Sequence, residues 1–324
     1  METRSGEGMR RISWLVAGGL SGLGAARLAG ADRWRLLETP AAPLMSFTPH
    51  VAAASLLGSV LLPRRGPAAV AALTGAALAA TVLPRALRQP QPRAGGPVLR
   101  VVTVNMLAGQ AAEEPVVDLV RRTDTDVLFV QELTETAMTR FKQAGLTDML
   151  PHEAADPRPE GGRGSGIYAR FPLTGGLTLR QTYAAQPTAR MRFPDGGQVD
   201  LVCAHPHPPN PPLSRVKIVR WREELAVLPP AAVPDLEPPR VLAGDFNASL
   251  DHAAFRRLLR LGHADAASQA GRGLAPTWSP WGSPALVTLD HVLVDPRCEV
   301  REFSVHPLPG SDHRAVYAAF RLPG

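Results

Sequence analysis

The sequence predicts an α/β fold for its larger C-terminal part, preceded by a strongly apolar N-terminal region. The 324 residues include 33 prolines and 29 glycines, which would be too many for a helical bundle. Short runs rich in β-branched residues recur after about residue 98, and segments with helical spacing of apolar residues follow some of them. The first ninety residues instead contain long stretches of Ala, Gly and Leu.

The charge of the chain is unevenly distributed. The whole sequence carries a net charge of +6, but residues 1–94 hold 11 arginines and 4 acidic residues. The remaining 24 basic and 25 acidic residues leave residues 95–324 at a net charge of −1. A nuclease that grips a duplex through many phosphates usually carries a basic excess. Nucleic acid is therefore a possible but disfavoured partner of the C-terminal part.

Three apolar stretches, at about residues 12–30, 44–62 and 67–83, each approach the ~17–25 residues that a helix needs to cross a bilayer. We predict three transmembrane helices. Two alternatives remain: the first stretch could be a cleaved signal peptide, because Arg10 and Arg11 precede it, or all three could form a buried helical subdomain.

The arginines that flank these stretches predict the orientation of the chain. The arginine pairs at residues 10–11 and 64–65 would stay on the cytoplasmic side, so three crossings place the rest of the chain outside, although Arg85, Arg88 and Arg93 argue against this. Residues 88–96 contain two prolines and no apolar periodicity, which predicts an extended tether. We expect a membrane region at residues 1–94 and a separate domain at residues 95–324.

The predicted strands of this domain place polar side chains at their ends. Strands are predicted at residues 101–104, 127–130, 199–202, 241–243 and 292–294, and helices at residues 115–122 and 252–261. The polar groups are Asn105, Gln131-Glu132, His205, Gly244-Asp245-Phe246-Asn247, Asp290 and Ser311-Asp312-His313. Such a collection predicts one polar site at the strand ends.

The residue types suit the hydrolysis of phosphate esters, which needs a divalent metal, a hydrogen-bonding frame and a base. Asp245 and Asn247 lie two residues apart on an extended segment, so both can face one phosphate, although the same residues could simply close an Asx turn. Glu132 is the best metal ligand, because Mg²⁺ usually takes one or two carboxylates. Histidine titrates near neutrality, and a neighbouring carboxylate can orient His313.

The ordered set of polar residues resembles the endonuclease/exonuclease/phosphatase superfamily, whose members include DNase I-like nucleases, sphingomyelinases and inositol phosphatases. The resemblance covers about residues 98–321. It implies a four-layered α/β sandwich of the DNase I-like type, in which two mixed sheets lie face to face, helices cover them outside, and the site lies where the strand ends of both sheets meet.

The same resemblance implies roles for individual residues. Glu132 and Asp312 would hold Mg²⁺ (or Mn²⁺), and Asn105 would ligate the metal or orient its waters. The catalytic set would be His205, Asp245, Asn247, Asp290 and His313. Asp290 would orient His313, and His205 would hydrogen-bond a phosphoryl oxygen or assist the leaving group. Whether His313 or Asp245 deprotonates the water stays open. A Trp beneath the site corresponds to Trp278.

Three membrane helices before such a domain, in an arginine-rich chain, are similar to the VanJ-type membrane proteins associated with teicoplanin resistance. We therefore expect a multi-pass protein of the cell membrane whose extracytoplasmic domain is a metal-dependent phosphoesterase. Its substrate would be a phosphate or pyrophosphate ester at the outer membrane surface, such as a lipid-linked cell-wall intermediate. The alternatives are an extracellular Mg-dependent nuclease and a non-enzymatic sensor of lipid phosphate.

The two cysteines leave two possibilities open. Cys203 and Cys298 lie in or beside predicted strands, and they could form one disulfide if the domain is outside the cell. They could equally be two buried thiols.

Overall fold

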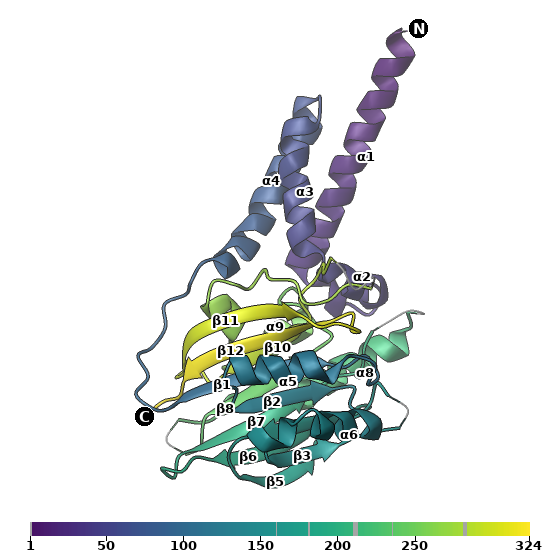
Figure 1. Ribbon diagram of the computed structural model, residues 1–324. Helices are drawn as coiled ribbons and strands as arrows, with labels where there is room; N and C mark the ends of the chain where they lie inside the picture. Colours follow the sequence, from purple (N-terminus) through teal and green to yellow (C-terminus); the bar gives the residue numbers. More distant parts are fainter. Residues whose placement is uncertain (1, 160, 181, 210–212, 235, 281–283) are drawn as a thin grey trace.

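The computed structural model describes residues 2–324 apart from residues 160, 181, 210–212, 235 and 281–283. A two-sheet α/β domain forms one part of the described chain, and long N-terminal helices project from one side of it (Figure 1). This arrangement separates the apolar helices from most of the domain while leaving them in contact with one edge.

The first sheet is mixed and has the strand order β11-β12-β1-β2-β4-β3. Its strands are β1 (Val98–Asn105), β2 (Val127–Gln131), β3 (His152–Asp156), β4 (Ser165–Ala169), β11 (Glu299–Pro307) and β12 (Arg314–Arg321). β1 and β2 are parallel, and the other neighbouring pairs are antiparallel.

The second sheet is also mixed, with the order β5-β6-β7-β8-β10-β9. Its strands are β5 (Leu173–Thr178), β6 (Pro187–Arg192), β7 (Gln198–Ala204), β8 (Arg240–Asp245), β9 (Ala264–Asp265) and β10 (Asp290–Val294). Here β7 and β8 form the parallel pair. The two sheets thus repeat one arrangement, with a central parallel pair whose strands end at the same edge.

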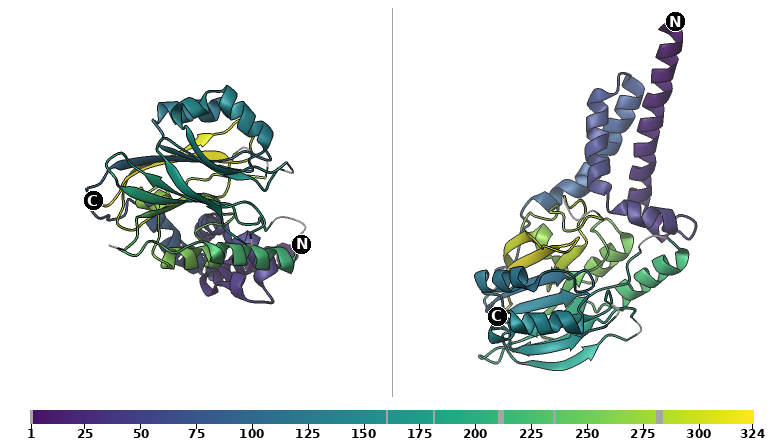
Figure 2. Two further views of the ribbon diagram at one scale, coloured as in Figure 1. Left: turned by 90° about the horizontal axis from the view of Figure 1, so that it is seen from below. Right: turned by 45° about the vertical axis from the view of Figure 1, so that its right-hand side comes forward.

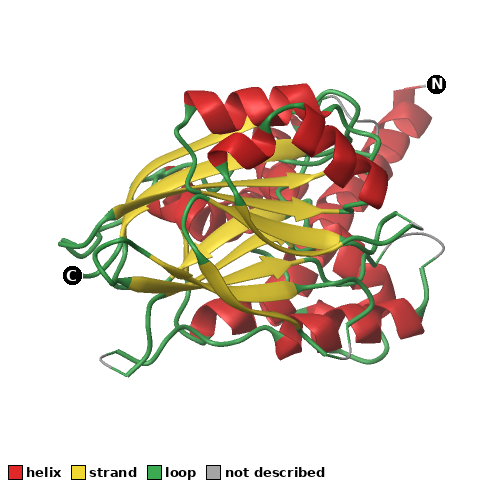
Figure 3. Ribbon diagram, turned by 60° about the horizontal axis from the view of Figure 1, so that its bottom comes forward, coloured by secondary structure: helices red, strands yellow, loops and turns green. Residues whose placement is uncertain are grey.

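Helices cover the outer faces of both sheets, so that four layers result (Figure 3). α5 (Glu113–Arg122), α6 (Glu135–Gln143) and α7 (Leu146–Met149) pack on the first sheet, and α8 (Arg215–Val227) and α9 (Ala253–Arg260) pack on the second. The short α10 (Ala266–Gln269) contributes to the core between the sheets. The predicted α/β sandwich, strands and helices are confirmed.

Successive side chains of β1 point to opposite faces of the sheet, and this explains how the layers form. Val101 points into the core between the sheets, where it meets side chains of the second sheet such as Val241, whereas Val102 and Val104 point outward to α5 and α6. All of these side chains are fully buried. Because both faces of the sheet are covered, its central strands are almost continuously apolar, as the sequence shows.

The N-terminal region consists of α1 (Glu2–Ala29), η1 (Ala31–Arg33), α2 (Glu38–Met45), α3 (Thr48–Leu61), α4 (Arg65–Val82) and η2 (Leu83–Ala86). By length and composition alone, Glu7–Ala29 and Arg65–Ala86 can each cross a bilayer. The predicted helix over residues 44–62 is interrupted instead: α2 and α3 meet at 78°, and a third span results only if this bent pair is counted as one. Pro49, in the first turn of α3, favours a new helix start there.

Residues 88–96 do not form a free tether. Gln91 accepts a hydrogen bond from the backbone N–H of Val300 and donates one to the carbonyl of Gln269, at 2.6 and 3.3 Å. Arg88 donates to the carbonyl of Val300 at 2.9 Å. The segment is extended as predicted, but it lies along the domain because its polar side chains reach unpaired backbone groups there.

The N-terminal helices adjoin one side of the domain (Figure 2), and they contact it at the loop between β8 and α9. Asp251 in this loop accepts bonds from Arg27 of α1 at 2.7 Å and from Arg85 of η2 at 2.7 and 2.8 Å. Next to it, Asp32 accepts the backbone N–H of Ala253 at 2.6 Å. These buried contacts join the two regions and begin only six residues after Asp245.

Both cysteines are buried free thiols in the core between the sheets. The disulfide that the sequence left open therefore does not form, and the second alternative holds. Burial raises the pKa of the Cys203 thiol to about 12, so it is not a reactive thiolate at neutral pH.

Candidate active site

The predicted site residues converge at one edge of the sandwich. Parallel strands β1 and β2 of the first sheet and β7 and β8 of the second end here, and the antiparallel strands β10 and β12 begin here. Polar residues that follow or open these strands are therefore brought together from distant parts of the sequence, namely Asn105, Glu132, His205, Asp245, Asn247, Asp290, Asp312 and His313.

Asp245 occupies the centre of this group. The preceding Gly244 has a φ of +152°, and a Cβ there would lie 1.9 Å from the carbonyl oxygen of Ala204 on the neighbouring strand. Only glycine permits this approach. Asn247 follows with a φ of +48°, and its backbone N–H donates to Asp245 Oδ1 at 2.8 Å. The Asx turn, which the sequence offered as the alternative to an extended segment, is thus present, and it holds the Asp245 carboxylate inside the site.

Asn105 connects the carboxylates of the two sheets. Its Nδ2 donates to Glu132 Oε1 and to Asp245 Oδ2, each at 3.1 Å. Its Oδ1 instead accepts the backbone N–H of Leu107 at 3.0 Å. In this arrangement Asn105 orients the acidic groups, and its Oδ1 is engaged by the backbone of Leu107.

Glu132 has an unusual backbone for its residue type, with a φ of +56°. Non-glycine residues adopt this region at a cost, and such positions cluster at functional sites. The strained turn directs the carboxylate back toward Asn105, and the backbone N–H of Ala108 donates to Glu132 Oε2 at 2.6 Å. The site therefore holds Glu132 from two sides.

His313 is fixed by Asp290. Its Nδ1 lies 2.9 and 3.1 Å from the two Asp290 carboxylate oxygens, and its Nε2 lies 3.6 Å from Asp245 Oδ2. The Asp290 carboxylate accepts a hydrogen bond from the Nδ1–H, so Nε2 is the nitrogen that faces the site. Asp290 and His313 thus orient one imidazole edge toward the central carboxylate.

Asp312 completes the acidic lining. Trp278 donates its indole N–H to Asp312 Oδ2 at 2.8 Å. The other oxygen, Oδ1, is buried, lies 3.9 Å from His313 Nε2 and has no hydrogen-bond partner among the described residues. A buried carboxylate oxygen without a partner is costly unless a ligand or ion satisfies it.

His205 faces the same centre from β7. Its Nε2 lies 3.9 Å from Glu132 Oε1 and 4.0 Å from Asp245 Oδ2. Its Nδ1 is buried and has no hydrogen-bond partner among the described residues. Burial lowers the pKa of His205, so a neutral imidazole faces the site.

The buried charges strongly affect one another. Burial raises the pKa of Asp245 to about 7; His313 opposes this shift and Asp290 adds to it. Burial by itself would lower the pKa of His313, but Asp290 and Asp245 outweigh it and raise that pKa to about 10. At neutral pH the His313 imidazole is therefore protonated on both nitrogens, and Asp245 is near its pKa, so that it can gain or lose a proton.

The donor set fits a hard divalent cation. Glu132 and Asp245 present carboxylate oxygens around the Asn105 amide, and Asp312 adds an oxygen that lacks a partner. Mg²⁺ favours such oxygens. A second group, Asp245, Asp290 and His313, has ligand atoms within 4.8 Å of one another, but His313 and Asp290 already bind each other. Among the described residues this is the group of acidic and histidine side chains close enough together to share one ion, and neither Glu132 nor Asp312 belongs to it.

Three supporting residues were not predicted to have a role. Thr277 Oγ1 accepts the backbone N–H groups of Leu289 and Asp290, at 3.0 and 3.1 Å. Gln186 accepts the backbone N–H of His205 at 3.1 Å, and the Ser311 hydroxyl donates to the carbonyl of Asn105 at 2.8 Å. Ser311 stands next to Asp312 in the motif. Gln186 and Thr277 act across the fold, and no local pattern in the sequence marks them.

Two further histidines support loops and strands instead of the site. His291 Nε2 lies 2.9 Å from the carbonyl oxygen of Ala248, and its Nδ1 lies 3.3 Å from Asp265. The backbone N–H of His207 donates to Glu224 at 2.9 Å. Both histidines therefore stabilise the fold around the site.

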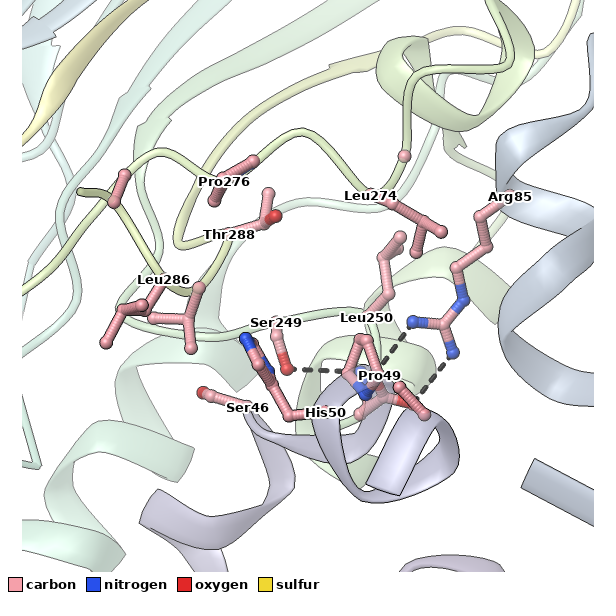
Figure 4. A pocket seen from close by; sticks show the side chains of 15 residues that line it. Ser46, Pro49, His50, Arg85, Ser249, Leu250, Leu274, Pro276, Leu286 and Thr288 are labelled. Atoms are coloured by element: carbon pink, nitrogen blue, oxygen red, sulfur yellow. Dashed lines mark hydrogen bonds and ion pairs between the residues drawn. The ribbon is translucent and has the colours of Figure 1, made fainter. Parts of the chain in front are cut away.

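A cavity of about 250 Å³ lies between the N-terminal helices and the loop that carries Trp278. Figure 4 shows His50 of α3 and Arg85 of η2 around this cavity together with Leu274, Leu286 and other loop residues. Its lining is largely apolar. The backbone of Val287, in the cavity wall, is hydrogen-bonded to Trp278, so the cavity borders the segment that supports Asp312.

Residues 102–313 match the model of the Endonuclease/Exonuclease/phosphatase family. The chain belongs to this family. Its members are metal-dependent phosphoester hydrolases, so the protein is an enzyme of that class. The resemblance inferred from the ordered polar residues is thereby confirmed at the family level.

Solved structures show the same fold at low sequence identity. One is an endonuclease/exonuclease/phosphatase from Beutenbergia cavernae, with 20% identity, a TM-score of 0.52, and coverage of 70% of this chain and 72% of that chain. Another is a humanized D. rerio TDP2, with 16% identity, a TM-score of 0.52, and coverage of 69% and 99%. A mutant of the beta toxin from Staphylococcus aureus, solved with bound magnesium ions, has 13% identity, a TM-score of 0.50, and coverage of 70% and 100%. A search of curated proteins gives no match.

Proposed function

We propose that the protein is a membrane-anchored phosphoesterase that hydrolyses a phosphate or pyrophosphate ester at the outer surface of the bilayer. The observation that carries this proposal is the convergence of Glu132, Asp245 and His313 in one polar group, in a domain whose loop after Asp245 is bonded to helices of membrane-crossing length. Anchoring would raise the effective concentration of the enzyme over a substrate confined to the same surface.

Each polar residue has a role in the proposed reaction. Asp245 accepts the proton of the attacking water, since its pKa of about 7 suits a general base at neutral pH. His313, protonated and held by Asp290, donates from Nε2 to a phosphoryl oxygen and stabilises the charge that develops there. The Asn247 amide donates to the carbonyl of Pro206 at 3.1 Å and would use its second N–H for the same phosphate, and the His205 imidazole would assist the departing oxygen.

Glu132 and Asp312 would hold the divalent cation, and Asn105 would orient Glu132 toward it. Mg²⁺ or Mn²⁺, when bound, supplies Lewis-acid polarisation of the phosphoryl group. The magnesium ions reported for the beta toxin structure, together with the oxygen-rich donor set of this site, support this proposal.

Three features favour a lipid-linked substrate over nucleic acid. Residues 95–324 carry a net charge of −1, so they have no basic excess for a duplex. The largely apolar cavity at the junction borders the loop that positions Trp278. The flanking arginines favour an extracytoplasmic domain. A cell-wall intermediate is a substrate of this kind, and the VanJ-type resemblance then suggests an indirect role in teicoplanin resistance.

The test is an assay of purified full-length protein in detergent with Mg²⁺, against a lipid pyrophosphate, a soluble phosphodiester and plasmid DNA. We expect phosphate release from the lipid, its loss on chelation of the metal, and a fall of roughly 10³-fold or more for Asp245→Ala and His313→Ala. Glu153→Gln, which removes an exposed carboxylate on β3, is the matched control and should leave the rate unchanged.

Plasmid nicking without lipid hydrolysis would support the nuclease alternative instead. Hydrolysis that persists in both site variants would show that the chemistry lies elsewhere in the protein.

A further inference from the structure

A second cavity, of about 490 Å³, lies between the segment that follows α1 and the outer helices α8 and α9. Figure 1 shows α2 beside α8 at this junction. We call it the basic cavity, because five arginines and three acidic residues line it. None of the catalytic or metal-site candidates belongs to its lining, so it is distinct from the active site.

The acidic residues on its inner wall already have partners. Glu38 is buried and accepts bonds from Arg215 at 2.8 Å and from Arg222 at 2.5 Å. Asp32 is buried and accepts the backbone N–H of Ala253. These contacts build the cavity wall, and the five arginines and three acidic residues of the lining together leave a net charge of +2.

The remaining arginines have no such partners. Arg257 and Arg260 of α9 are exposed, and neither forms an ion pair or a side-chain hydrogen bond within the described part of the chain. Arg33 contacts only backbone carbonyl groups, at 3.4 Å. Opposite these three cations the lining offers Glu223 as a further acid. The cavity mouth therefore has an excess of positive charge that suits an anion.

The position of the cavity indicates where the anion comes from. The candidate span of α1 ends at Ala29, and Arg33 follows four residues later. Between Arg33 and Glu38, Trp34 and Leu36 are 51% and 91% exposed. Exposed Trp and Leu beside arginines are typical of a segment in the headgroup layer of a bilayer, where the rings and chains reach apolar material.

We propose that the basic cavity binds the headgroup of an anionic phospholipid and thereby seats the domain on the bilayer. The phosphate would lie between Arg33, Arg257 and Arg260, while Trp34 and Leu36 enter the interface beside it. This inference rests on the membrane anchoring of the proposed function, but it does not depend on the reaction at Asp245. The same arginines could in chemical terms bind free phosphate, so the test must separate the two sources.

The experiment measures lipid retention by native mass spectrometry of full-length protein in detergent containing equal amounts of phosphatidylglycerol and phosphatidylcholine. We expect selective retention of phosphatidylglycerol, and affinity reduced roughly 30-fold in Arg257→Gln/Arg260→Gln, because each arginine near an anionic surface contributes about a factor of five. Arg257→Lys/Arg260→Lys keeps the charge and should retain most of the binding.

The matched control is Arg122→Gln/Arg192→Gln, which removes two exposed arginines of α5 and β6 that lie outside the cavity. Thermal unfolding in the same detergent verifies that each variant is folded. Equal retention of both lipids, unchanged retention in Arg257→Gln/Arg260→Gln, or displacement of the lipid by millimolar inorganic phosphate would overturn the proposal.

The proposed reaction is tested separately from this site. Asp245→Ala should lose hydrolysis but retain phosphatidylglycerol as the wild type does. Resistance of the protein to extraction by alkaline carbonate tests the anchor itself. If the protein retains phosphatidylglycerol selectively but hydrolyses no phosphate ester, the lipid site at the basic cavity is supported and only the proposed reaction is refuted.

Discussion

At the scale of single residues, Gly244 determines how closely β7 and β8 approach beside Asp245. We expect Gly244→Ala to destabilise the protein by about 2 kcal/mol or more and to abolish activity, because the new Cβ would lie 1.9 Å from the Ala204 carbonyl oxygen. Thermal unfolding and the phosphate-release assay measure both effects.

Gly196 provides the control for this substitution. It also has a positive φ, of +90°, but nothing lies within 4 Å of a Cβ placed there. Gly196→Ala should therefore cost only the backbone strain, about 1 kcal/mol, and leave activity intact. Equal effects of the two substitutions would show that the contact with Ala204 is unimportant.

At the scale of elements, the β8–α9 loop joins the domain to α1 and η2 through Asp251. The pKa of Asp251 is lowered because Arg85 and Arg27 outweigh the effect of burial. Asp251→Asn leaves two largely buried arginines without their carboxylate, which should cost about 3–5 kcal/mol at pH 7. Thermal unfolding of the full-length protein in detergent tests this expectation.

The pH dependence of that effect follows from the direction of the shift. A carboxyl group with a lowered folded-state pKa stabilises the protein above its unfolded pKa of about 3.9, and this contribution is lost as the pH falls through the folded pKa. The wild type and Asp251→Asn should thus converge in stability in strong acid. Asp118→Asn, in an exposed ion pair with Arg121, is the control and should cost under about 1 kcal/mol. A constant difference at every pH would contradict the assigned ion pairs.

At the scale of the whole molecule, residues 88–96 decide how rigidly the helices and the domain are connected. A fragment of residues 88–324 should be more stable than one of residues 97–324, by roughly 2–3 kcal/mol, because the shorter fragment loses the hydrogen bonds of Arg88 and Gln91. The measurement is the thermal unfolding of both fragments in the same buffer. Equal stability of the two fragments would show that residues 88–96 do not stabilise the domain.

Much of the domain followed from the sequence, because its determinants are local. Runs such as residues 241–243 are apolar on both faces, and they became central strands covered on both sides. Asp245 and Asn247 share one short motif, and the Asx turn that was its alternative conformation formed in place of the expected extended segment. The order of the polar residues along the chain also indicated the family that the comparison confirmed.

Other features depend on partners far away in the sequence. The bend between α2 and α3 was missed because residues 44–62 are almost continuously apolar, which predicts one helix. Pro43 lies inside α2, and Pro49 lies in the first turn of α3, where the new helix begins. The sequence predicted an extended segment at residues 88–96 but not its packing against the domain, because the partners of Gln91 lie about 180 and 210 residues away. The support of Asp290 by Thr277 likewise needs the folded loop.

By itself, the sequence determined the alternation of strands and helices, the apolar N-terminal region and the identity of the polar residues, since these depend on neighbours along the chain. Only the tertiary structure decided that Asn105 orients Glu132 and Asp245, that His313 keeps its proton, and that Arg257 and Arg260 face a cavity beside α2. The physical reason is that hydrogen bonds and buried charges act over a few ångströms in space, and the fold sets those distances.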